Sequence, residues 1–318
     1  MNRRPKVVVF GGGTGLSVLL RGLKKFPVDI TAIVTVADDG GSSGRLREEL
    51  DIIPPGDIRN VLAALSEVEP LVEQLFQHRF TNGNGLSGHS LGNLLLAAMS
   101  DITGNFVTGI RELSKVLNVR GKVLPASDHR VILNAQMNDG SIVSGESKIP
   151  HTGKQIVRVF LTPDTVKPLD ESLRAIRDAD LILIGPGSLY TSILPSLLVP
   201  GIPEEIKNST ARKVYICNVM TQPGETDYFT ASDHVNKLVS HIGQQIIDTI
   251  IVNNDKVPDN VLTKYEAEGG EPVEYDEKRL KSFGFKVISD KIVQYNDSLI
   301  RHDAKRVSEI ILDLVSDY

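Results

Sequence analysis

The sequence of 318 residues contains no tryptophan and a single cysteine, Cys217. One cysteine excludes an internal disulfide, and Cys217 lies in an apolar run, Val214 to Val219, that is typical of a buried strand. We therefore expect a reduced thiol with a packing role rather than a catalytic one. Aromatic residues make up only 5% of the chain, so few side chains are available to stack around a large planar cofactor.

Long runs of one residue class are also missing. No stretch approaches the roughly 20 apolar residues that a membrane-spanning helix needs. Two arginines precede the apolar run Val7 to Phe10, as in a signal peptide, but that run meets three glycines at once. No run of Lys or Arg suits nucleic acid, and the formal net charge is -5. We expect a cytoplasmic protein that inserts into no membrane and binds no nucleic acid, although a small anionic ligand needs only a local pocket.

The composition, 41% hydrophobic and 24% charged, is that of an ordinary globular protein. The first forty residues predict one βαβ unit. A buried strand at Lys6–Phe10 is followed by a glycine turn, a helix with leucines at helical spacing, and a second strand at Asp29–Ala37. Such a crossover connection is right-handed.

Strands and helices continue to alternate along the chain. Helices are predicted at Ile58–Leu65, Pro70–His78, Leu91–Met99 and Ala304–Val315, and buried strands at Leu181–Gly185, Lys213–Asn218 and Ile247–Asn253. This alternation predicts an α/β fold: a three-layer, Rossmann-like, doubly wound and mostly parallel sheet, with residues 1–318 as a single nucleotide-binding domain. Asn138-Asp139-Gly140 is a hairpin signal, so a small antiparallel β insertion is expected over residues 120–165.

The glycine loop after the first strand is the first candidate for ligand binding. Gly12, Gly13, Thr14 and Gly15 would let backbone N–H groups approach phosphate oxygens at the start of a helix. Val18 occupies the third glycine position of the dinucleotide pattern, which argues against an NAD(P)-dependent dehydrogenase. A tight glycine turn without a ligand is the alternative interpretation.

The second candidate is the segment after the second strand. Adjacent carboxylates there, Asp38 and Asp39, could hold Mg²⁺ or accept ribose hydroxyls. Ser42, Ser43 and Arg45 could hold phosphate beside the first loop. The alternative is a flexible polar loop with surface acids.

Two helix starts carry further polar residues. Asp57 is expected as an N-cap, while Arg59 and Asn60 could face the crevice. Ser90 and Asn93 would project from the first turn of the helix that begins at Leu91, which is a favourable position for an anion.

The histidines give no catalytic or metal-binding pattern. No partner acid can be placed beside His89, so we favour capping or ligand hydrogen bonding over a general base. Metal-ligand spacing is absent among His78, His129, His151, His234 and His241, so no structural zinc is expected.

Later loops also follow predicted strands. Gly185, Gly187 and Ser188 come after one strand, near the expected reversal of strand order, and Asn218 and Thr221 end the next. Open α/β sheets bind ligands at such positions.

Two residues near the end of the chain could also contact a nucleotide. Tyr265 could stack on a base or simply pack in the core. Arg301 could reach a diphosphate or merely pair with Asp303.

With these loops assembled, the chain resembles the CofD-like superfamily, and most closely its YvcK-type branch, the bacterial gluconeogenesis factors. The segments that carry the resemblance are FGGGTGLS from Phe10, VADDGGSSGRLR from Val36, PPGDIRN from Pro54, GHSLGN from Gly88, GPGSLYTSI from Gly185 and CNVMTQPGET from Cys217. They extend over most of the chain in consistent order.

The resemblance implies a cytoplasmic protein needed for normal cell shape on gluconeogenic carbon sources. It implies binding of a UDP-sugar such as UDP-N-acetylglucosamine, and a protein partner in cell-wall regulation. Carried over by position, Gly12 to Gly15 would hold the diphosphate. Gly185, Gly187 and Ser188 would line the same crevice, and Asn218 and Thr221 would border it.

The other branch of the superfamily, the 2-phospho-L-lactate transferases, uses Mg²⁺ held by aspartates. Asp38, Asp39 and Asp57 stand where such ligands would lie. Two hypotheses follow: a UDP-sugar-binding regulator without turnover or catalytic residues, and a Mg²⁺-dependent transferase acting on a nucleotide-diphosphate-linked substrate.

Overall fold

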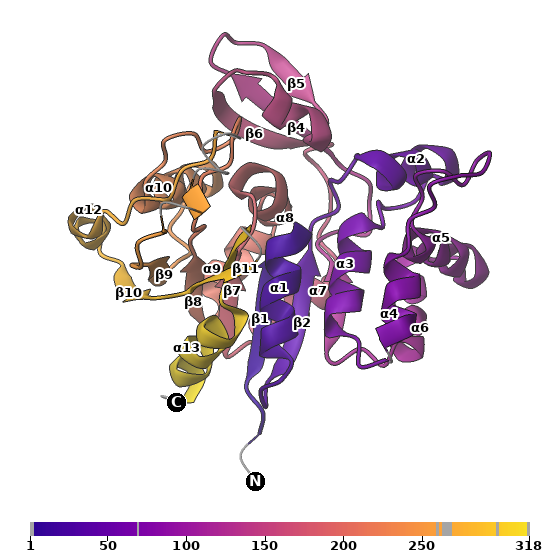
Figure 1. The fold of residues 1–318 in the computed structure, drawn as a ribbon, viewed down its shortest axis with the longest axis horizontal. Helices are drawn as coiled ribbons and strands as arrows, with labels where there is room; N and C mark the ends of the chain where they lie inside the picture. Colours follow the sequence, from indigo (N-terminus) through magenta and orange to yellow (C-terminus); the bar gives the residue numbers. More distant parts are fainter. Residues whose placement is uncertain (1–2, 69, 259–260, 263–268, 297–298, 317–318) are drawn as a thin grey trace.

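The computed structural model describes residues 3–68, 70–258, 261–262, 269–296 and 299–316 (Figure 1). Its centre is a seven-stranded sheet in the order β10-β9-β8-β7-β1-β2-β3, with every neighbouring pair parallel. The strands are β1 (Lys6–Gly11), β2 (Asp29–Val34), β3 (Lys122–Pro125), β7 (Leu181–Ile184), β8 (Arg212–Ile216), β9 (Thr249–Asn253) and β10 (Lys286–Asp290). The strand order reverses at β1, because β2 and β3 extend to one side and the later strands to the other.

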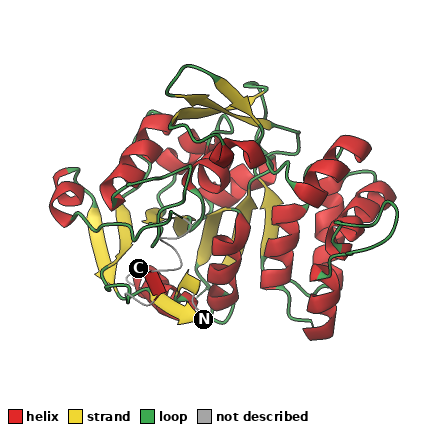
Figure 2. Cartoon of the chain, turned by 45° about the horizontal axis from the view of Figure 1, so that its top comes forward, coloured by secondary structure: helices red, strands yellow, loops and turns green. Residues whose placement is uncertain are grey.

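Helices cover both faces of this sheet (Figure 2). The described helices are α1 (Gly13–Leu23), α2 (Gly41–Leu50), α3 (Gly56–Leu65), α4 (Pro70–Gln77), α5 (Leu91–Thr103), α6 (Phe106–Val116), α7 (Asp170–Arg177), α8 (Leu194–Leu197), α9 (Ile202–Asn208), α10 (Ala231–Ile242), α12 (Glu277–Ser282) and α13 (Ala304–Ser316). Strands between two helical layers must be apolar on both faces, and all four residues of β7 are fully buried. The predicted Rossmann-like, doubly wound α/β class is confirmed.

The small antiparallel sheet is also present, and it lies at the top of Figure 1. It consists of β4 (Ile132–Met137), β5 (Ile142–Ser144) and β6 (Ile156–Thr162), in the order β5-β4-β6. Residues 138–141, which include the Asn138-Asp139-Gly140 hairpin signal, join β4 to β5 as predicted. The expected range of 120–165 began too early, because β3 pairs with β2 in the main sheet.

The sequence also failed to predict some elements between β2 and β3. The segment after β2, for which a flexible polar loop was the alternative interpretation, continues from Gly41 as helix α2, and α6 was not expected. Two glycines and two serines open α2, and these residues have low intrinsic helix propensity, so tertiary packing decides its conformation.

A two-stranded antiparallel sheet, β11 (Val293–Asn296) and β12 (Leu299–His302), precedes α13. It brings the end of the chain back to α1, against which α13 packs. Within the described ranges, no helix combines the length and the apolar character needed to cross a bilayer.

Candidate functional site

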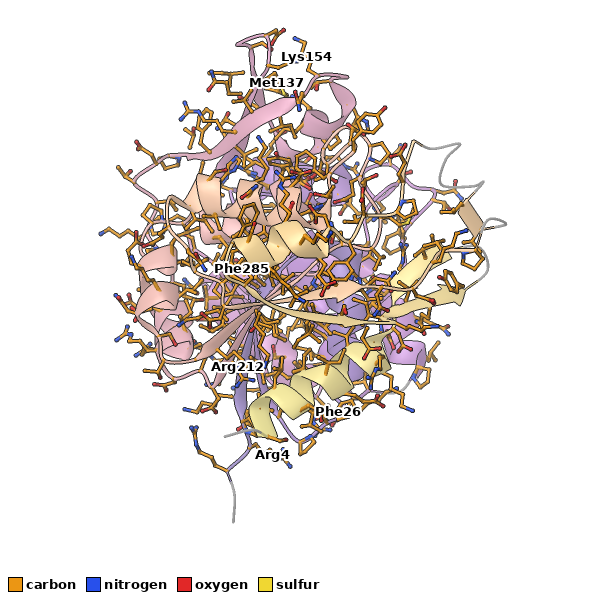
Figure 3. The ribbon with its side chains drawn as sticks, turned by 90° about the vertical axis from the view of Figure 1, so that its left-hand side faces the viewer. Arg4, Phe26, Met137, Lys154, Arg212 and Phe285 are labelled. Carbon is orange, nitrogen blue, oxygen red and sulfur yellow. The ribbon has the colours of Figure 1, made fainter. Side chains whose placement is uncertain are left out.

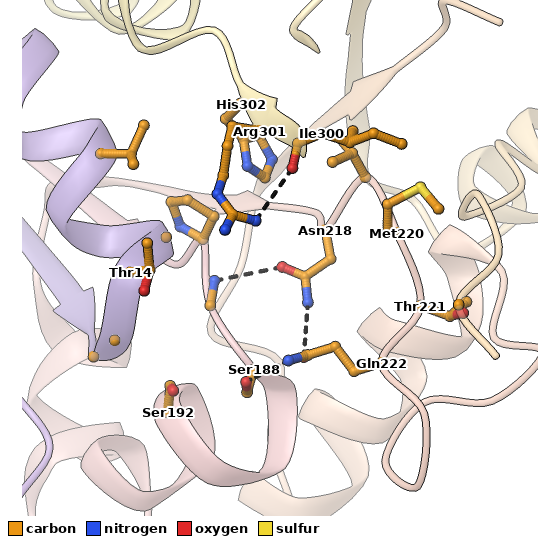
Figure 4. A pocket seen from close by; sticks show the side chains of 18 of the residues that line it. Thr14, Ser188, Ser192, Asn218, Met220, Thr221, Gln222, Ile300, Arg301 and His302 are labelled. Carbon is orange, nitrogen blue, oxygen red and sulfur yellow. Dashed lines mark hydrogen bonds between the residues drawn. The ribbon is translucent and has the colours of Figure 1, made fainter. Parts of the chain in front are cut away.

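A cavity of about 390 Å³ lies at the carboxyl ends of β1, β7 and β8, where the strand order reverses (Figure 4). Three loops form it: the glycine loop at the start of α1, the loop after β7 and the loop after β8. Strand β12 closes another side with Ile300, Arg301 and His302. Parallel strands end at the same edge of the sheet, so the fold brings together residues that are far apart in sequence.

The glycine loop lines this cavity with Gly12, Gly13, Thr14 and Gly15. Helix α1 begins at Gly13, whose φ of +66° is in the left-handed region that favours glycine. A Cβ at Gly12 would lie 2.5 Å from Oδ2 of Asp57, so glycine is required there by a neighbouring side chain. Val18, one turn into α1, also lines the cavity, so the departure from the dinucleotide pattern lies at the cavity itself.

Asp57 does not cap its own helix, which corrects the sequence prediction. The N-cap of α3 is Pro55, which makes no side-chain capping bond. Asp57 Oδ1 instead accepts the backbone N–H of Gly13 at 2.8 Å. Burial and the neighbouring Asp38 raise the pKa of Asp57 to about 7, against the opposing effect of the Gly13 N–H. An acid that titrates near neutrality therefore stands at the start of α1.

The loops after β7 and β8 are joined by a chain of hydrogen bonds, drawn in part in Figure 4. Asn218 Oδ1 accepts the Gly187 N–H at 3.4 Å, and Asn218 Nδ2 donates to Gln222 Oε1 at 3.4 Å. Gln222 Nε2 in turn donates to Ser188 Oγ at 2.6 Å. The structure thus brings Gly187, Ser188 and Asn218 together as predicted, whereas Gly185 does not line the cavity.

Thr221 and Arg301 both line the cavity, but they differ in how far their polar atoms are already engaged in hydrogen bonds within the protein. Thr221 is buried and its Oγ1 accepts the N–H of Glu271 at 2.9 Å. Within the part of the chain that the structure describes, Arg301 donates only to the carbonyl of its neighbour Ile300, at 3.3 Å. The alternative pairing with Asp303 is wrong, since that carboxylate accepts the backbone N–H groups of Lys305 and Arg306 at the start of α13.

Several lining residues were not singled out from the sequence. Ser192 lies across from Thr14 in Figure 4, and His302 and Gln222 complete the wall. His302 Nε2 is 3.0 Å from the Cys217 carbonyl, and burial lowers the pKa of this imidazole. Cys217 directly follows the last residue of β8 and is buried. Burial raises the pKa of its thiol to about 12, which agrees with a packing role. Tyr265 lies outside the described residues.

The serine and asparagine candidates of α2 and α5 lie outside the cavity lining. They bond to one another: Asn93 Nδ2 donates to Ser42 Oγ at 3.0 Å and to Ser43 Oγ at 3.5 Å. Ser42 Oγ is 2.9 Å from Nδ1 of His89. Ser90 is the N-cap of α5, accepting the Asn93 N–H. We call these five residues the α2–α5 polar cluster, and its contacts tie two helix starts together.

The predicted cations of this region are also engaged away from the cavity. Arg59 donates to Ser90 Oγ and, at 2.8 Å, to Asn60 Oδ1. Arg45 donates to the Ser87 carbonyl at 2.8 Å. Arg45, Arg59 and Asn60 are not among the cavity's lining residues. The sequence placed all these loops in one crevice, whereas the structure divides them into two groups.

The three aspartates proposed for Mg²⁺ do not form a preformed site. Asp39 Oδ1 accepts the Ser147 N–H at 2.8 Å, and Asp38 Oδ1 accepts the Gly40 N–H at 2.9 Å. Among the residues that the structure describes, no group of three or more His, Cys, Asp or Glu side chains is arranged to hold a metal ion. These aspartates therefore supply no complete set of protein ligands, and Mg²⁺ binding, which needs only one or two carboxylates beside substrate phosphates, stays a prediction.

Two further acids near this region were missed from the sequence. Burial, followed by the charges of Asp38 and Asp57, raises the pKa of Glu146 to about 8. Burial also raises the pKa of Glu225 to about 7, although Glu225 Oε1 accepts the Thr191 hydroxyl at 3.1 Å. Glu225 lies in the loop after β8 and Glu146 follows β5. Glu225 is buried and Glu146 half-buried by segments distant in sequence, so local sequence patterns give no sign of their raised pKa values.

Comparison with known proteins gives consistent results. The family model described as 2-phospho-L-lactate transferase CofD matches residues 7–293. The gluconeogenesis factor of Halalkalibacterium halodurans is 68% identical over 311 residues, which cover 98% of this chain and 97% of that one. That of Bacillus subtilis is 64% identical over 317 residues and covers 100% of both. A crystal structure of a UPF0052 family member from Bacillus halodurans superposes with a TM-score of 0.95 at 68% identity, covering 97% of this chain and 100% of that one.

Proposed function

Because this chain belongs to the CofD family, we propose that it is a regulatory protein that binds a UDP-sugar, UDP-N-acetylglucosamine, in the cavity at the ends of β1, β7 and β8. In this proposal the cytoplasmic protein returns the ligand unchanged. Occupancy alters its contact with a protein partner in cell-wall regulation.

The observation that carries the proposal is the position and lining of the cavity. It lies at the switch point of a parallel sheet, where the first turn of α1 meets the loop after β7. The free N–H groups of a helix start suit phosphate oxygens, and Arg301 adds a positive charge on the opposite wall. A volume of about 390 Å³ is in the usual range for small-molecule sites.

The lining favours binding without turnover. Ser188 is bonded to Gln222, and Thr221 accepts from the backbone of Glu271. Among the described lining residues, no hydroxyl is hydrogen-bonded to a histidine or a carboxylate. A serine or threonine nucleophile needs such a partner to be activated. The relatives named gluconeogenesis factors, at 64% and 68% identity, support the regulatory role.

The family model favours a second candidate, a transferase acting on a nucleotide-diphosphate-linked substrate. Mg²⁺ in such an enzyme would neutralise charge on the diphosphate. Among the described residues no group of three metal ligands is found, so in this candidate Mg²⁺ would be held partly by the phosphates of the substrate.

A calorimetric and thermal-melt series tests the proposal. The purified protein is titrated with UDP-N-acetylglucosamine, UDP-glucose, GDP and NAD, each with and without Mg²⁺, and the nucleotide is recovered and analysed by chromatography. At 100 times its dissociation constant a ligand adds about 2.7 kcal/mol to the stability. We expect stabilisation by UDP-N-acetylglucosamine, recovered intact. Stabilisation by GDP that needs Mg²⁺, or consumption of the ligand, would establish the transferase instead.

A further inference from the structure

A second cavity, of about 620 Å³, lies at the opposite ends of the strands, beside the amino-terminal halves of β1, β2 and β3. Helix α7 forms its other wall. Arg4 borders it and lies at the end of the molecule opposite Met137 in Figure 3. The two cavities share no lining residue, so this one stands apart from the proposed nucleotide site.

The cavity arises from the register of the sheet. Lys6 of β1 is paired with Asp29 of β2, and two residues further on Thr31 is paired with both Val8 and Lys122. Alternate residues of a strand point to the same face, so these side chains belong to one face of the sheet. All of them line the cavity. A polar face is unusual for central strands of a parallel sheet, which are normally apolar on both sides.

Helix α7 lines the cavity with one face, through Glu171, Arg174, Ala175 and, just beyond its end, Asp178. Their spacing of three, four and seven residues is that of one helix stripe. The cavity is therefore a groove between this stripe and the polar part of the sheet. Buried Val8 and Leu124 form apolar parts of its floor.

Some of the charges in the groove are already paired. Lys6 Nζ is 3.3 Å from Asp178, Glu171 accepts from Arg111 at 2.7 Å, and Arg120 lies 3.7 Å from Glu67. Each ion pair contributes no net charge, so the unpaired charged side chains set the net charge of the groove.

Four charged side chains of the groove have neither a hydrogen-bond nor an ion-pair partner within the described part of the chain: Arg4, Asp29, Lys122 and Arg174. Three cations and one anion give a net charge of about +2, in a protein whose formal net charge is -5. Uncompensated positive charge around a concave, partly apolar groove is a feature of anion-binding sites.

We propose that this groove binds a small organic phosphate monoester, a metabolite separate from the nucleotide-sugar ligand. A phosphate monoester carries a charge of about -1.5 to -2 at neutral pH, which matches the excess in the groove. The planar guanidinium groups of Arg4 and Arg174 suit phosphate oxygens. The carbon skeleton of the ester would lie on Val8 and Leu124, with the Thr31 hydroxyl near its polar groups.

A dicarboxylate has the same total charge but distributes it over two ends. Arg and Lys side chains recognise either group, so the test must separate them. It must also separate the groove from the nucleotide cavity, which is lined by phosphate-binding loops of its own.

The experiment is isothermal titration of the intact chain with glucose 6-phosphate and with glycerol 3-phosphate. Succinate serves as the dicarboxylate arm, glucose as the neutral arm and inorganic phosphate as the headgroup alone. Arg174→Gln and Lys122→Gln remove one unpaired cation each. Lys207→Gln, on the exposed side of α9 and outside both cavities, is the matched control. Thermal melts check that each variant is folded.

We expect at least one phosphate ester to bind more tightly than succinate, glucose and inorganic phosphate. Each groove variant should weaken that binding by about tenfold, as expected for loss of one charged hydrogen bond, with the control unchanged. Saturating UDP-N-acetylglucosamine should not displace the ester. No binding of either ester at millimolar concentration, preference for succinate, equal affinity in the folded groove variants, or displacement by the UDP-sugar would each overturn the proposal.

Discussion

The carboxylate of Asp57 accepts the backbone N–H of Gly13 at 2.8 Å, so a side chain of α3 occupies one of the amide donors at the start of α1. The sequence suggested that these donors would all face a phosphate. Because the positive end of a helix dipole stabilises a nearby anion, Asp57 occupies part of that favourable environment. The affinity for an anionic ligand should therefore depend on whether Asp57 is ionised.

Replacing Asp57 with Asn keeps a possible acceptor for the Gly13 N–H and removes the charge. With a pKa near 7, Asp57 is mostly ionised at pH 8 and mostly neutral at pH 6. Wild-type affinity for UDP-N-acetylglucosamine should thus rise as the pH falls from about 8 to about 6. The D57N protein should bind a few-fold more tightly than the wild type at pH 8, with little pH dependence. Titration calorimetry at both pH values measures this, and a large loss of affinity in D57N would instead show that the carboxylate helps to hold the ligand.

Gly13→Arg should abolish binding of the UDP-sugar, because the new side chain would extend into the cavity. The matched control is Gly13→Ala, since a Cβ at Gly13 meets nothing nearer than Ser192 Oγ at 3.7 Å. Both variants bear the cost of a non-glycine residue at φ +66°, about 1 kcal/mol. Affinities that fall equally in both variants would assign the effect to backbone strain rather than to the cavity.

Arg301→Gln should weaken UDP-sugar binding by about tenfold, since among the described residues the guanidinium has no ion-pair partner and donates only to the Ile300 carbonyl. The loss should shrink at high salt, because screening already reduces the contribution of the charge. Lys207→Gln again serves as the control. An unchanged affinity would place the diphosphate away from β12.

Glu225→Gln should stabilise the folded protein at high pH. The pKa of Glu225 is raised from 4.5 to about 7, so the folded state binds a proton that the unfolded state lacks between these values. The stabilisation that protonated Glu225 gives the wild-type protein is fully present below pH 4.5 and is lost as the pH rises through about 7. The variant should gain on the order of 1–3 kcal/mol over the wild type at pH 8 and little at pH 5.

Urea denaturation at several pH values measures the difference between the two proteins, in which the contributions of other titrating groups cancel. Glu48→Gln on the exposed side of α2 is the control and should show no such trend. An identical pH dependence for E225Q and the wild type would contradict the predicted titration.

Ser90→Ala should cost about 2 kcal/mol of unfolding free energy, because Ser90 both caps α5 and accepts from the buried Arg59. Asn105→Ala removes the exposed N-cap of α6 alone and should cost about 1 kcal/mol. Thermal or urea unfolding compares the two variants. Equal losses would mean that the Arg59 contact contributes nothing.

Local sequence patterns were enough for five of the seven strands of the main sheet and for the loops that end them, whereas β3 was assigned to the antiparallel insertion. Buried β-branched runs, glycine turns and amphipathic spacing predicted β1, β2, β7, β8 and β9 and placed Gly12 to Gly15, Gly187, Ser188 and Asn218 in one crevice. Polar helix starts misled the prediction. Gly41 to Leu50 looks like a loop, because its residues have weak helix propensity and only packing makes them helical.

The sequence by itself determined the fold class and the strand ends. A strand buried on both faces requires a continuous apolar run, and the turn after it requires glycines, so both can be recognised from neighbouring residues. Tertiary structure alone decided that Asp57 bonds Gly13, that Arg59 and Asn93 turn away from the cavity, and that Glu146 and Glu225 titrate near neutrality. Those properties depend on partners from distant segments and on exclusion of water. Neither the identity of a distant partner nor the depth of burial of a single polar side chain is encoded in the spacing of its neighbours.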